Sequence, residues 1–319
     1  MKTVKQSLSR GVASIAANDR IWSLLEHTLL QVTRRLEFER MMIRRLRGEA
    51  ADEADFRRVC PDSVVQRGAF AGMRYPTLRS LGSSTIFPKL LGTYEDELAG
   101  IIEQICQTDY SEVIDVGCGE GYYAVGLALR IPGAKVYAYD TDPNARLSCE
   151  RMAELNGVSD RVVIDSFCSA DTLARLPIRK RALVIADCEG YERHLFTPSS
   201  AAALASHDLL IEVHDFIDVT ISDHLRLVFE ATHNIETVQS LDDIRKARAC
   251  GVPTLQALPI EIRLRLMREQ RPAGMEWFVL RPKSDEATRV RPRLDEAAGY
   301  ATSSAQDAGA QIPAGRRRP

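Results

Sequence analysis

Residues 112–128 carry the feature that most limits the fold of this chain. They read Glu-Val-Ile-Asp-Val, then Gly-Cys-Gly-Glu-Gly, then Tyr-Tyr-Ala-Val-Gly-Leu-Ala. The apolar first part predicts a buried strand, and the last part predicts a helix that begins near Tyr122. Between them, Gly117, Gly119 and Gly121 allow the backbone to fold closely under a ligand. Because a helix N-terminus also presents free N–H groups, the pattern indicates a nucleotide-type binding site.

The spacing of these glycines excludes two common nucleotide sites. The dinucleotide pattern Gly-x-Gly-x-x-Gly would need a glycine where Tyr122 stands, and the P-loop ending Gly-Lys-Ser/Thr is absent. The chain has Asp-x-Gly-x-Gly-x-Gly instead, with Asp115 at the end of the strand. A carboxylate there repels a pyrophosphate but suits a ligand with an ammonium group. The stretch resembles motif I of the class I methyltransferases that use S-adenosylmethionine (SAM), which implies SAM as the cofactor.

Asp140 supplies a second cofactor signal. It follows a predicted strand at 135–139 and stands 23 residues after Gly117. A carboxylate at this point can accept hydrogen bonds from both hydroxyls of a ribose. The alternative role of a helix cap is already filled by Asp142, which precedes Pro143 at the start of the next predicted helix. We therefore predict that Asp140 binds the ribose.

The resemblance to these methyltransferases implies further contacts to adenine. Thr141 would lie under the edge of the ring. Ser169, in the loop after the third strand, aligns with the position at which these enzymes bind the adenine amino group, and Asp171 lies two residues further on. Phe167 would pack either on the ring or in the core.

Strands and helices alternate after the glycine stretch, which predicts a parallel sheet. The first predicted strand begins at 112, and the others cover 135–139, 161–165, 181–187, 208–214, 234–240 and 276–282. The main predicted helices between them cover 143–156, 190–204 and 219–232. Seven strands match the Rossmann-like α/β fold of the class I methyltransferases, a mostly parallel sheet with helices on both faces and an antiparallel last strand.

The chain divides into three predicted parts. Residues 1–108 form an N-terminal helical extension with a small strand-turn-strand segment at 64–76, and residues 109–283 form the methyltransferase domain. Residues 284–319 are poor in aromatic side chains and are predicted to be a disordered tail. Within the domain, 241–275 is longer than a hairpin needs and reads as one or two short helices. This insertion could cover the substrate or could elaborate the surface.

The N-terminal extension contains two predicted helices. Apolar residues recur at helical spacing over 21–47, and arginines crowd the opposite side. We favour a face that packs on the main domain or on a second subunit of a homo-oligomer, and the alternative is an anionic partner or a membrane surface. The second helix would run from a Thr93 cap through Gln104, with Tyr94 and Glu95 lining the cofactor cleft or capping the helix.

Composition limits the partners and the compartment. The 42 basic and 44 acidic residues leave a formal charge of −2, so no nucleic-acid partner is expected. The seven cysteines form no Cys-x-x-Cys pair, which indicates a reducing compartment. The sequence has no apolar run of membrane-spanning length and no recognisable signal peptide. We therefore expect a cytoplasmic protein with no membrane partner.

The end of the fourth predicted strand reads Asp-Cys-Glu-Gly-Tyr-Glu at 187–192. This resembles the FkbM-type methyltransferases, in which Asp-Val-Glu-Gly-x-Glu is common. Ile-Glu-Val-His at 211–214 and Gly-Tyr-Tyr at 121–123 extend the resemblance. The Asn-Pro-Pro-Tyr-like motif of the adenine-directed and ribosomal-protein methyltransferases does not occur here. The resemblance implies O-methylation of a hydroxyl on a small molecule or a glycan.

Such a hydroxyl must lose its proton, either to a general base or with the help of a metal. Asp187 and Glu189 follow the fourth strand and His214 ends the fifth, at the sheet edge where ligands bind in these folds. We predict His214 or Glu189 as the base and Asp187 as a positioning group near the methyl donor. A helix cap or a strand-end hydrogen bond is the alternative for each. Whether these residues and Glu212 gather a divalent cation stays open.

Two other functions stay open from the sequence. The first is a protein or RNA methyltransferase in which the N-terminal extension recognises the substrate, although the near-neutral charge argues against RNA. The second is a non-catalytic SAM-binding assembly protein in which the long N-terminal helix drives association.

Overall fold

The computed structural model describes residues 54–76, 86–269, 271 and 274–283, together with Asn18 and Arg40. Apart from Arg40, the predicted helix at 21–47 lies outside the described residues, and so does the predicted tail at 284–319. The proposed role of that helix in a homo-oligomer therefore stays a prediction.

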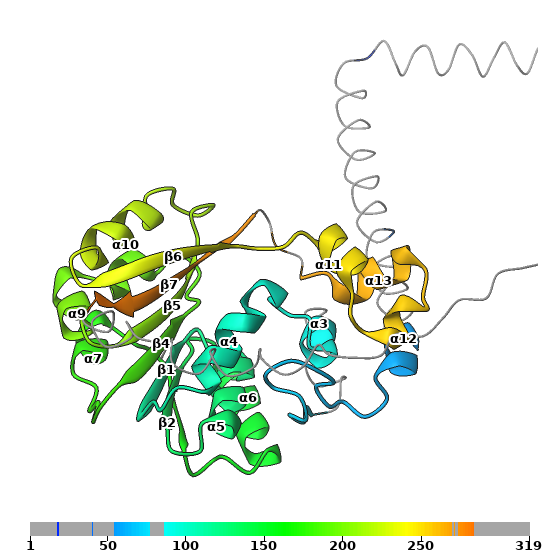
Figure 1. The fold of residues 1–319 in the computed structure, drawn as a ribbon, viewed down its shortest axis with the longest axis horizontal. Coiled ribbons are helices and arrows are strands. Elements are labelled where there is room, and N and C mark those ends of the chain that lie inside the picture. The colour runs from blue at the N-terminus through cyan, green and yellow to red at the C-terminus, as the bar shows by residue number, and fades with distance from the viewer. Residues whose placement is uncertain are drawn as a thin grey trace, which may run out of the picture.

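The described chain forms one seven-stranded sheet with the strand order β3-β2-β1-β4-β5-β7-β6 (Figure 1). Strands β1 to β5 run parallel, and β7 runs antiparallel to both β5 and β6. The strands are β1 Glu112–Val116, β2 Lys135–Tyr139, β3 Val162–Asp165, β4 Ala182–Ala186, β5 Asp208–Val213, β6 His233–Gln239 and β7 Glu276–Pro282. The predicted fold class, with its antiparallel last strand, is confirmed.

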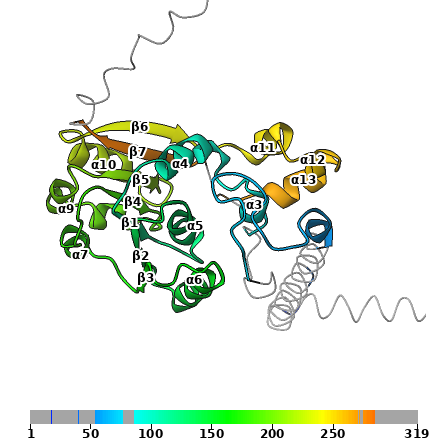
Figure 2. The same ribbon diagram turned by 60° about the horizontal axis from the view of Figure 1, so that its bottom comes forward.

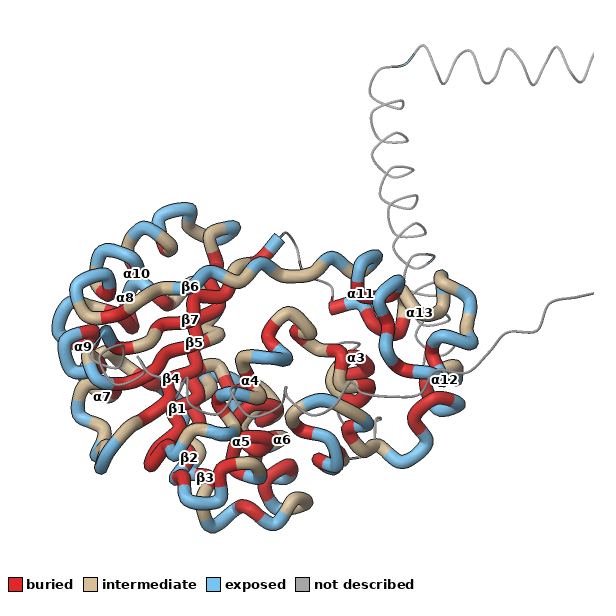
Figure 3. Tube along the Cα trace, viewed as in Figure 1, coloured by how far each residue is buried: buried red, intermediate tan, exposed pale blue. Residues whose placement is uncertain are grey.

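Helices cover both faces of the sheet (Figures 1 and 2). Side chains alternate between the faces along each strand, so Val113 of β1 packs on one side and Ile114 on the other. The first face is covered by α4 Ala99–Cys106, α5 Tyr122–Arg130 and α6 Pro143–Leu155. The second is covered by α7 Ala170–Ala174, α8 Glu192–Leu195, α9 Pro198–Ala203 and α10 Ile221–Phe229. The central strands are consequently buried on both faces (Figure 3).

A second group of helices packs beside the sheet. It contains α3 Ile86–Leu91, α11 Asp243–Ala249, α12 Pro253–Gln256 and α13 Ile260–Met267. Helix α13 contacts α3, and both lie near the segment 54–76 (Figures 1 and 2). The 3₁₀ turn η2 Asp96–Leu98 connects this group to α4. None of the helices in the described part of the chain combines the length and apolar composition that a membrane crossing needs.

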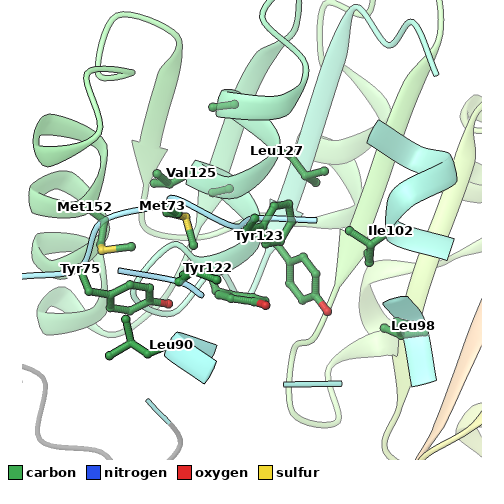
Figure 4. Packing of buried hydrophobic residues seen from close by; sticks show 14 of the residues in the cluster. Met73, Tyr75, Leu90, Leu98, Ile102, Tyr122, Tyr123, Val125, Leu127 and Met152 are labelled. Atoms are coloured by element: carbon green, nitrogen blue, oxygen red, sulfur yellow. The ribbon is translucent and has the colours of Figure 1, made fainter. Parts of the chain in front are cut away.

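The segment 54–76 packs against the helix that follows the glycine turn. Met73 and Tyr75 lie beside Tyr122 and Tyr123 of α5 in one buried cluster (Figure 4). The predicted strand-turn-strand is reduced to a single antiparallel bridge between Val64 and Arg74. Anchored in this way, the N-terminal part of the described chain stabilises the helix that supports the cofactor turn.

Two local predictions are wrong. The single helix predicted at 190–204 is two short helices, because Pro198 restricts Thr197 to an extended backbone and Thr197 then caps α9 together with Ser200. The predicted Thr93 cap does not form, since the buried Thr93 hydroxyl donates to the carbonyl of Pro88. The helix that was to begin at Thr93 starts as η2 at Asp96.

Candidate functional site

The glycine turn follows β1 and packs closely against the backbone at the carboxyl end of β4. Gly117 has φ +89°, and a Cβ added there would lie 1.7 Å from the backbone oxygen of Asp187. Only glycine fits this contact, because the backbone conformation and the space both exclude a side chain. The N–H groups of Gly117 and Cys118 donate to the carbonyl of Tyr139 at 2.8 Å and 3.0 Å, which ties the turn to β2.

Asp140 lies at the end of β2 and faces this turn. Its Oδ2 atom accepts a hydrogen bond from the N–H of Gly119 at 2.9 Å, and its Oδ1 atom accepts one from the N–H of Asp142 at 2.8 Å. These two backbone bonds fix the carboxylate between the turn and the start of α6. The remaining lone pairs of a carboxylate can still accept the two hydroxyls of a ribose.

A cavity of about 440 Å³ opens beside Asp140, within the range of about 300–1,000 Å³ typical of small-molecule sites. A Cβ at Gly119 would meet nothing within 4 Å, so the turn offers open backbone to a ligand. Five predicted cofactor residues line the cavity, namely Gly117, Gly119, Asp140, Thr141 and Asp187. The other lining residues are Val116, Tyr139, Ser166, Phe167, Cys168, Cys188, Glu189 and Tyr191.

Three predicted cofactor residues lie outside this lining. Gly121 is the N-cap of α5 with φ +95° and packs on Cys149. The Ser169 hydroxyl caps α7 by accepting from the N–H of Thr172 at 3.0 Å, so Ser166 and Phe167 form that part of the wall instead. No sequence pattern distinguishes these neighbouring loop residues.

Asp115 is the third of these residues, and it is buried behind the glycine turn. Its Oδ2 atom has no hydrogen-bond partner among the described residues. Burial, with a smaller contribution from the Asp187 carboxylate, raises the pKa of Asp115 to about 7. Such an unpaired acidic oxygen next to the cavity fits a ligand with a cationic amino group better than it fits a phosphate.

His214 stands at the centre of a cluster of four carboxylates beside the cavity. Its Nδ1 atom lies 2.6 Å from Oε1 of Glu192. Its Nε2 atom lies 3.4 Å from Oδ1 of Asp187, 3.6 Å from Oε2 of Glu189 and 3.7 Å from Oε2 of Glu212. The three predicted catalytic residues therefore lie together, and Asp187 belongs to both the cluster and the cavity wall.

The carboxylates control the protonation of this cluster. Burial alone would lower the pKa of His214, but the hydrogen bond to Glu192 and the nearby Asp187 and Glu189 outweigh it and raise that pKa. Burial and the adjacent Asp187 carboxylate also raise the pKa of Glu212. The residues of the cluster thus bind protons close to the cavity.

Glu189 has an unusual backbone. Its φ of 50° lies in the left-handed region, and Gly190 follows with φ 93°. This tight turn leaves the Glu189 side chain 78 % exposed at the mouth of the cavity while its carboxylate still faces His214. Left-handed non-glycine residues are concentrated at functional sites, which agrees with the predicted role of Glu189.

Charged side chains connect the insertion at 241–275 to the carboxylate cluster around His214. Arg271 approaches Glu212 at 3.5 Å, Glu97 at 3.1 Å and Glu269 at 2.8 Å. Glu269 also pairs with the buried Lys246 of α11. The described residues of the insertion contribute nothing to the cavity lining, so its predicted role as a substrate cover stays untested.

Tyr94 and Glu95 do not line the cavity either. The backbone N–H of Glu95 donates to Oε1 of Glu269 at 2.9 Å. The carboxylate of Glu95 accepts a hydrogen bond from the Tyr123 hydroxyl. Burial raises the pKa of Glu95. Glu95 therefore joins the insertion to α5, a role for which its sequence position gave no signal.

Sequence reasoning assigned no role to Glu192 or Arg271. Glu192 is the last residue of the Asp-x-Glu-Gly-x-Glu pattern. Its spacing from Asp187 could have indicated that it contacts a residue at the end of a neighbouring strand. Arg271 lies in an insertion without a motif, and only its packing against η2 and β5 brings it to Glu212.

The part of this domain that contains the glycine turn is similar to known proteins. Residues 99–187 match the family model of ribosomal protein L11 methyltransferase (PrmA). The ribosomal protein L11 methyltransferase of Acinetobacter baumannii is 45 % identical over 65 residues, which are 20 % of this chain and 21 % of that protein. Residues 99–187 contain the glycine turn, Asp140 and the strands that hold them. The matched region is thus similar to part of these methyltransferases.

Two further similarities were found. A protein of Pyrobaculum calidifontis named "Probable cobalt-precorrin-6B C(15)-methyltransferase (decarboxylating)" is 42 % identical over 73 residues, 23 % of this chain and 37 % of that protein. The crystal structure of a SAM-dependent methyltransferase from Geobacter sulfurreducens in complex with S-adenosyl-L-homocysteine aligns over 59 % of this chain and 91 % of that one, at 17 % identity and a TM-score of 0.36. This chain spans 21 % and 37 % of the length of the two curated relatives.

The match to the methyltransferase family model ends at Asp187. Glu189, Glu192, Glu212 and His214 all lie beyond it. The family match therefore does not cover the cluster around His214.

Proposed function

We propose that this chain is a SAM-dependent methyltransferase that methylates a hydroxyl of a small molecule or a glycan. One observation carries the proposal: Asp187 lines the cofactor cavity, and its Oδ1 atom lies 3.4 Å from Nε2 of His214. A group that can take up a proton is thus adjacent to the space for the methyl donor. Methyl transfer to a hydroxyl needs both at once.

The cavity residues suit the parts of SAM. Asp140 would accept the two ribose hydroxyls, and Thr141 and Phe167 would contact the adenine. The buried carboxylate of Asp115 would attract the cationic amino acid part through the turn. SAM supplies a methyl group on a sulfonium, an electrophile that needs alignment more than activation. The protein then has to orient the acceptor and remove its proton.

Glu189 and His214 are the two candidates for proton removal. Glu189 is the accessible one, since its side chain is 78 % exposed and that of His214 is 2 % exposed. Oε2 of Glu189 lies 3.6 Å from Nε2 of His214, so the negative charge of Glu189 would stabilise a proton taken up by His214. Asp187, between this pair and the cavity, would position the acceptor hydroxyl near the methyl group.

The choice of a hydroxyl acceptor rests on the sequence beyond the family match. Asp-Cys-Glu-Gly-Tyr-Glu at 187–192 and Ile-Glu-Val-His at 211–214 resemble the FkbM-type methyltransferases. The structure gives these residues a shared location, since Glu192 and His214 form a hydrogen bond of 2.6 Å. This supports an FkbM-like acceptor site beside the cofactor-binding part of the domain.

Methylation of a protein is the second candidate. It is favoured by the match of residues 99–187 to the ribosomal protein L11 methyltransferase model. Against it stands the end of β4, where Asp187-Cys188-Glu189 replaces the Asn-Pro-Pro-Tyr-like motif. An exposed side chain at the cavity mouth is compatible with either acceptor, so experiment has to decide.

Two measurements test the function. Isothermal titration with SAM should give saturable binding, and no binding would refute the function together with its protein alternative. Methyl-labelled SAM should then transfer its label to small polar molecules when the protein is incubated with fractionated cell extract. Label in the precipitated protein fraction would favour the second candidate. Binding without any transfer would point to a non-catalytic SAM-binding protein.

A further inference from the structure

We propose that Asp187, Glu212 and His214 form a binding site for one divalent first-row transition-metal cation. One oxygen from each carboxylate and one nitrogen of His214 lie within 4.8 Å of one another. Two residues come from the ends of neighbouring strands, because His214 follows β5 and Asp187 follows β4. The site is thus built on rigid elements of the sheet.

The contact distances favour a shared cation over direct hydrogen bonds. The distances from His214 Nε2 to the oxygens of Asp187 and Glu212 are 3.4 Å and 3.7 Å. Hydrogen bonds between such groups are about 2.7–3.2 Å long. Two ligands bound at about 2.0–2.2 Å to one cation are separated by roughly 3.0–3.6 Å, depending on the coordination geometry. A small contraction would bring the three atoms to this separation.

An unpaired oxygen of Asp187 and the buried carboxylate of Glu212 point to a missing positive partner. Oδ1 of Asp187 is a buried atom with no hydrogen-bond partner in the described chain. The Glu212 side chain is only 9 % exposed and lies 3.7 Å from Nε2 of His214. Its nearest cationic group is Arg271 at 3.5 Å, which it shares with three other glutamates. Buried carboxylates without donors are strongly unfavourable unless they meet a cation.

Glu192 gives His214 the orientation of a metal ligand. It is fully buried and binds Nδ1 at 2.6 Å, so the opposite nitrogen, Nε2, is directed at Asp187 and Glu212. Metal-bound histidines commonly have their second nitrogen bound by a carboxylate in this way. Glu189, exposed and 3.6 Å from Nε2, can supply a further oxygen or leave a position open to the acceptor.

The ligand set indicates the kind of cation. Carboxylates suit hard cations, whereas imidazole suits first-row transition metals, so a mixture favours Mn²⁺, Fe²⁺ or Zn²⁺ over Ca²⁺. Two carboxylates also neutralise the charge of a divalent ion. A cation here would act as a Lewis acid at the acceptor side of the cavity. The site is inferred from these residues alone and does not depend on the proposed methyl transfer.

The site can be tested by titrating the full chain with Mn²⁺. The readout is the loss of the free Mn²⁺ signal in electron paramagnetic resonance. We expect saturation at one equivalent and competition by Zn²⁺. Glu212→Gln, Asp187→Asn and His214→Ala should each weaken Mn²⁺ binding at least about 10-fold. The matched variants Glu261→Gln, Asp171→Asn and His194→Ala carry exposed side chains away from the cluster and should bind Mn²⁺ as the unchanged protein does.

Stability provides a second measurement. Mn²⁺ should raise the melting temperature of the unchanged protein and leave that of Glu212→Gln unchanged, since only a cation bound to the native state stabilises it. The isosteric Glu212→Gln and Asp187→Asn decide the matter if His214→Ala does not fold. Unsaturable binding, or equal affinity in both isosteric variants, would overturn the cation site. SAM titration is a separate measurement, so failure of either proposal is distinguishable from failure of the other.

Discussion

Glu192 Oε1 lies 2.6 Å from His214 Nδ1, and both side chains are almost completely buried. The pair joins the start of α8 to the end of β5, two points that are 22 residues apart in the chain. Replacing Glu192 by Gln keeps the shape but can turn the imidazole to the wrong tautomer. We expect kcat and Mn²⁺ affinity to fall about 10- to 100-fold in Glu192→Gln.

The affinity for SAM should be unchanged in this variant, because Glu192 does not line the cavity. Glu154→Gln, on the exposed side of α6, is the matched control and should behave as the unchanged protein. Normal turnover and normal Mn²⁺ binding in Glu192→Gln would show that the pair only supports the fold.

Gly117→Ala should destabilise the protein by at least about 2 kcal/mol, because the added Cβ would lie 1.7 Å from the carbonyl oxygen of Asp187 at a positive φ. Gly133→Ala is the control: nothing lies within 4 Å of its Cβ and its φ is not positive. That variant should be neutral or stabilised by up to about 1 kcal/mol. Urea unfolding measures both, and equal stabilities would contradict the close contact of β1 with β4.

Asp140→Ala should weaken SAM binding about 100-fold in isothermal titration. The carboxylate would accept two ribose hydroxyls, and a hydrogen bond to a charged group contributes about 1.5–3 kcal/mol. Asp171→Ala, at an exposed position of α7, should bind SAM normally. Unchanged affinity in Asp140→Ala would refute the ribose assignment.

Lys246→Met should destabilise the protein by about 3–5 kcal/mol, since it leaves the buried carboxylate of Glu269 without its lysine partner. Arg245→Met removes an exposed ion pair of the same helix, with Asp242, and should change stability by about 1 kcal/mol or less. Thermal unfolding compares the two variants. Equal effects would mean that the Lys246 pair contributes no more than a surface pair.

The part of the stability that His207 and His233 contribute should fall as the pH drops from 7 toward 5. Burial lowers the pKa of both below the ordinary value of 6.5, so the unfolded chain takes up protons that the folded chain does not. Their contribution is complete above pH 6.5 and is lost as the pH falls toward the folded pKa. In urea unfolding, the stability of His233→Gln relative to that of the exposed control His194→Gln should rise as the pH falls from 7 to 5. An identical dependence would contradict this assignment.

Local sequence patterns determined much of this fold. The apolar runs before Gly117 and over 182–186 are buried strands because no other arrangement covers both of their faces. The predicted bounds of β2 and β7 agree with the structure, and α5 begins at Tyr122 as predicted. Asp140 faced the turn as expected because a strand of known length fixes where its end lies.

Tertiary structure alone decided the contents of the acceptor side. The sequence placed Asp187, Glu189 and His214 at one sheet edge, but the distances that make them a possible cation site depend on how β4 and β5 pair. The burial of Glu212 beside Arg271 depends on how the insertion folds back, which no local pattern encodes. Short-range periodicity thus determined the elements and the cofactor turn, whereas long-range packing determined which charged groups meet.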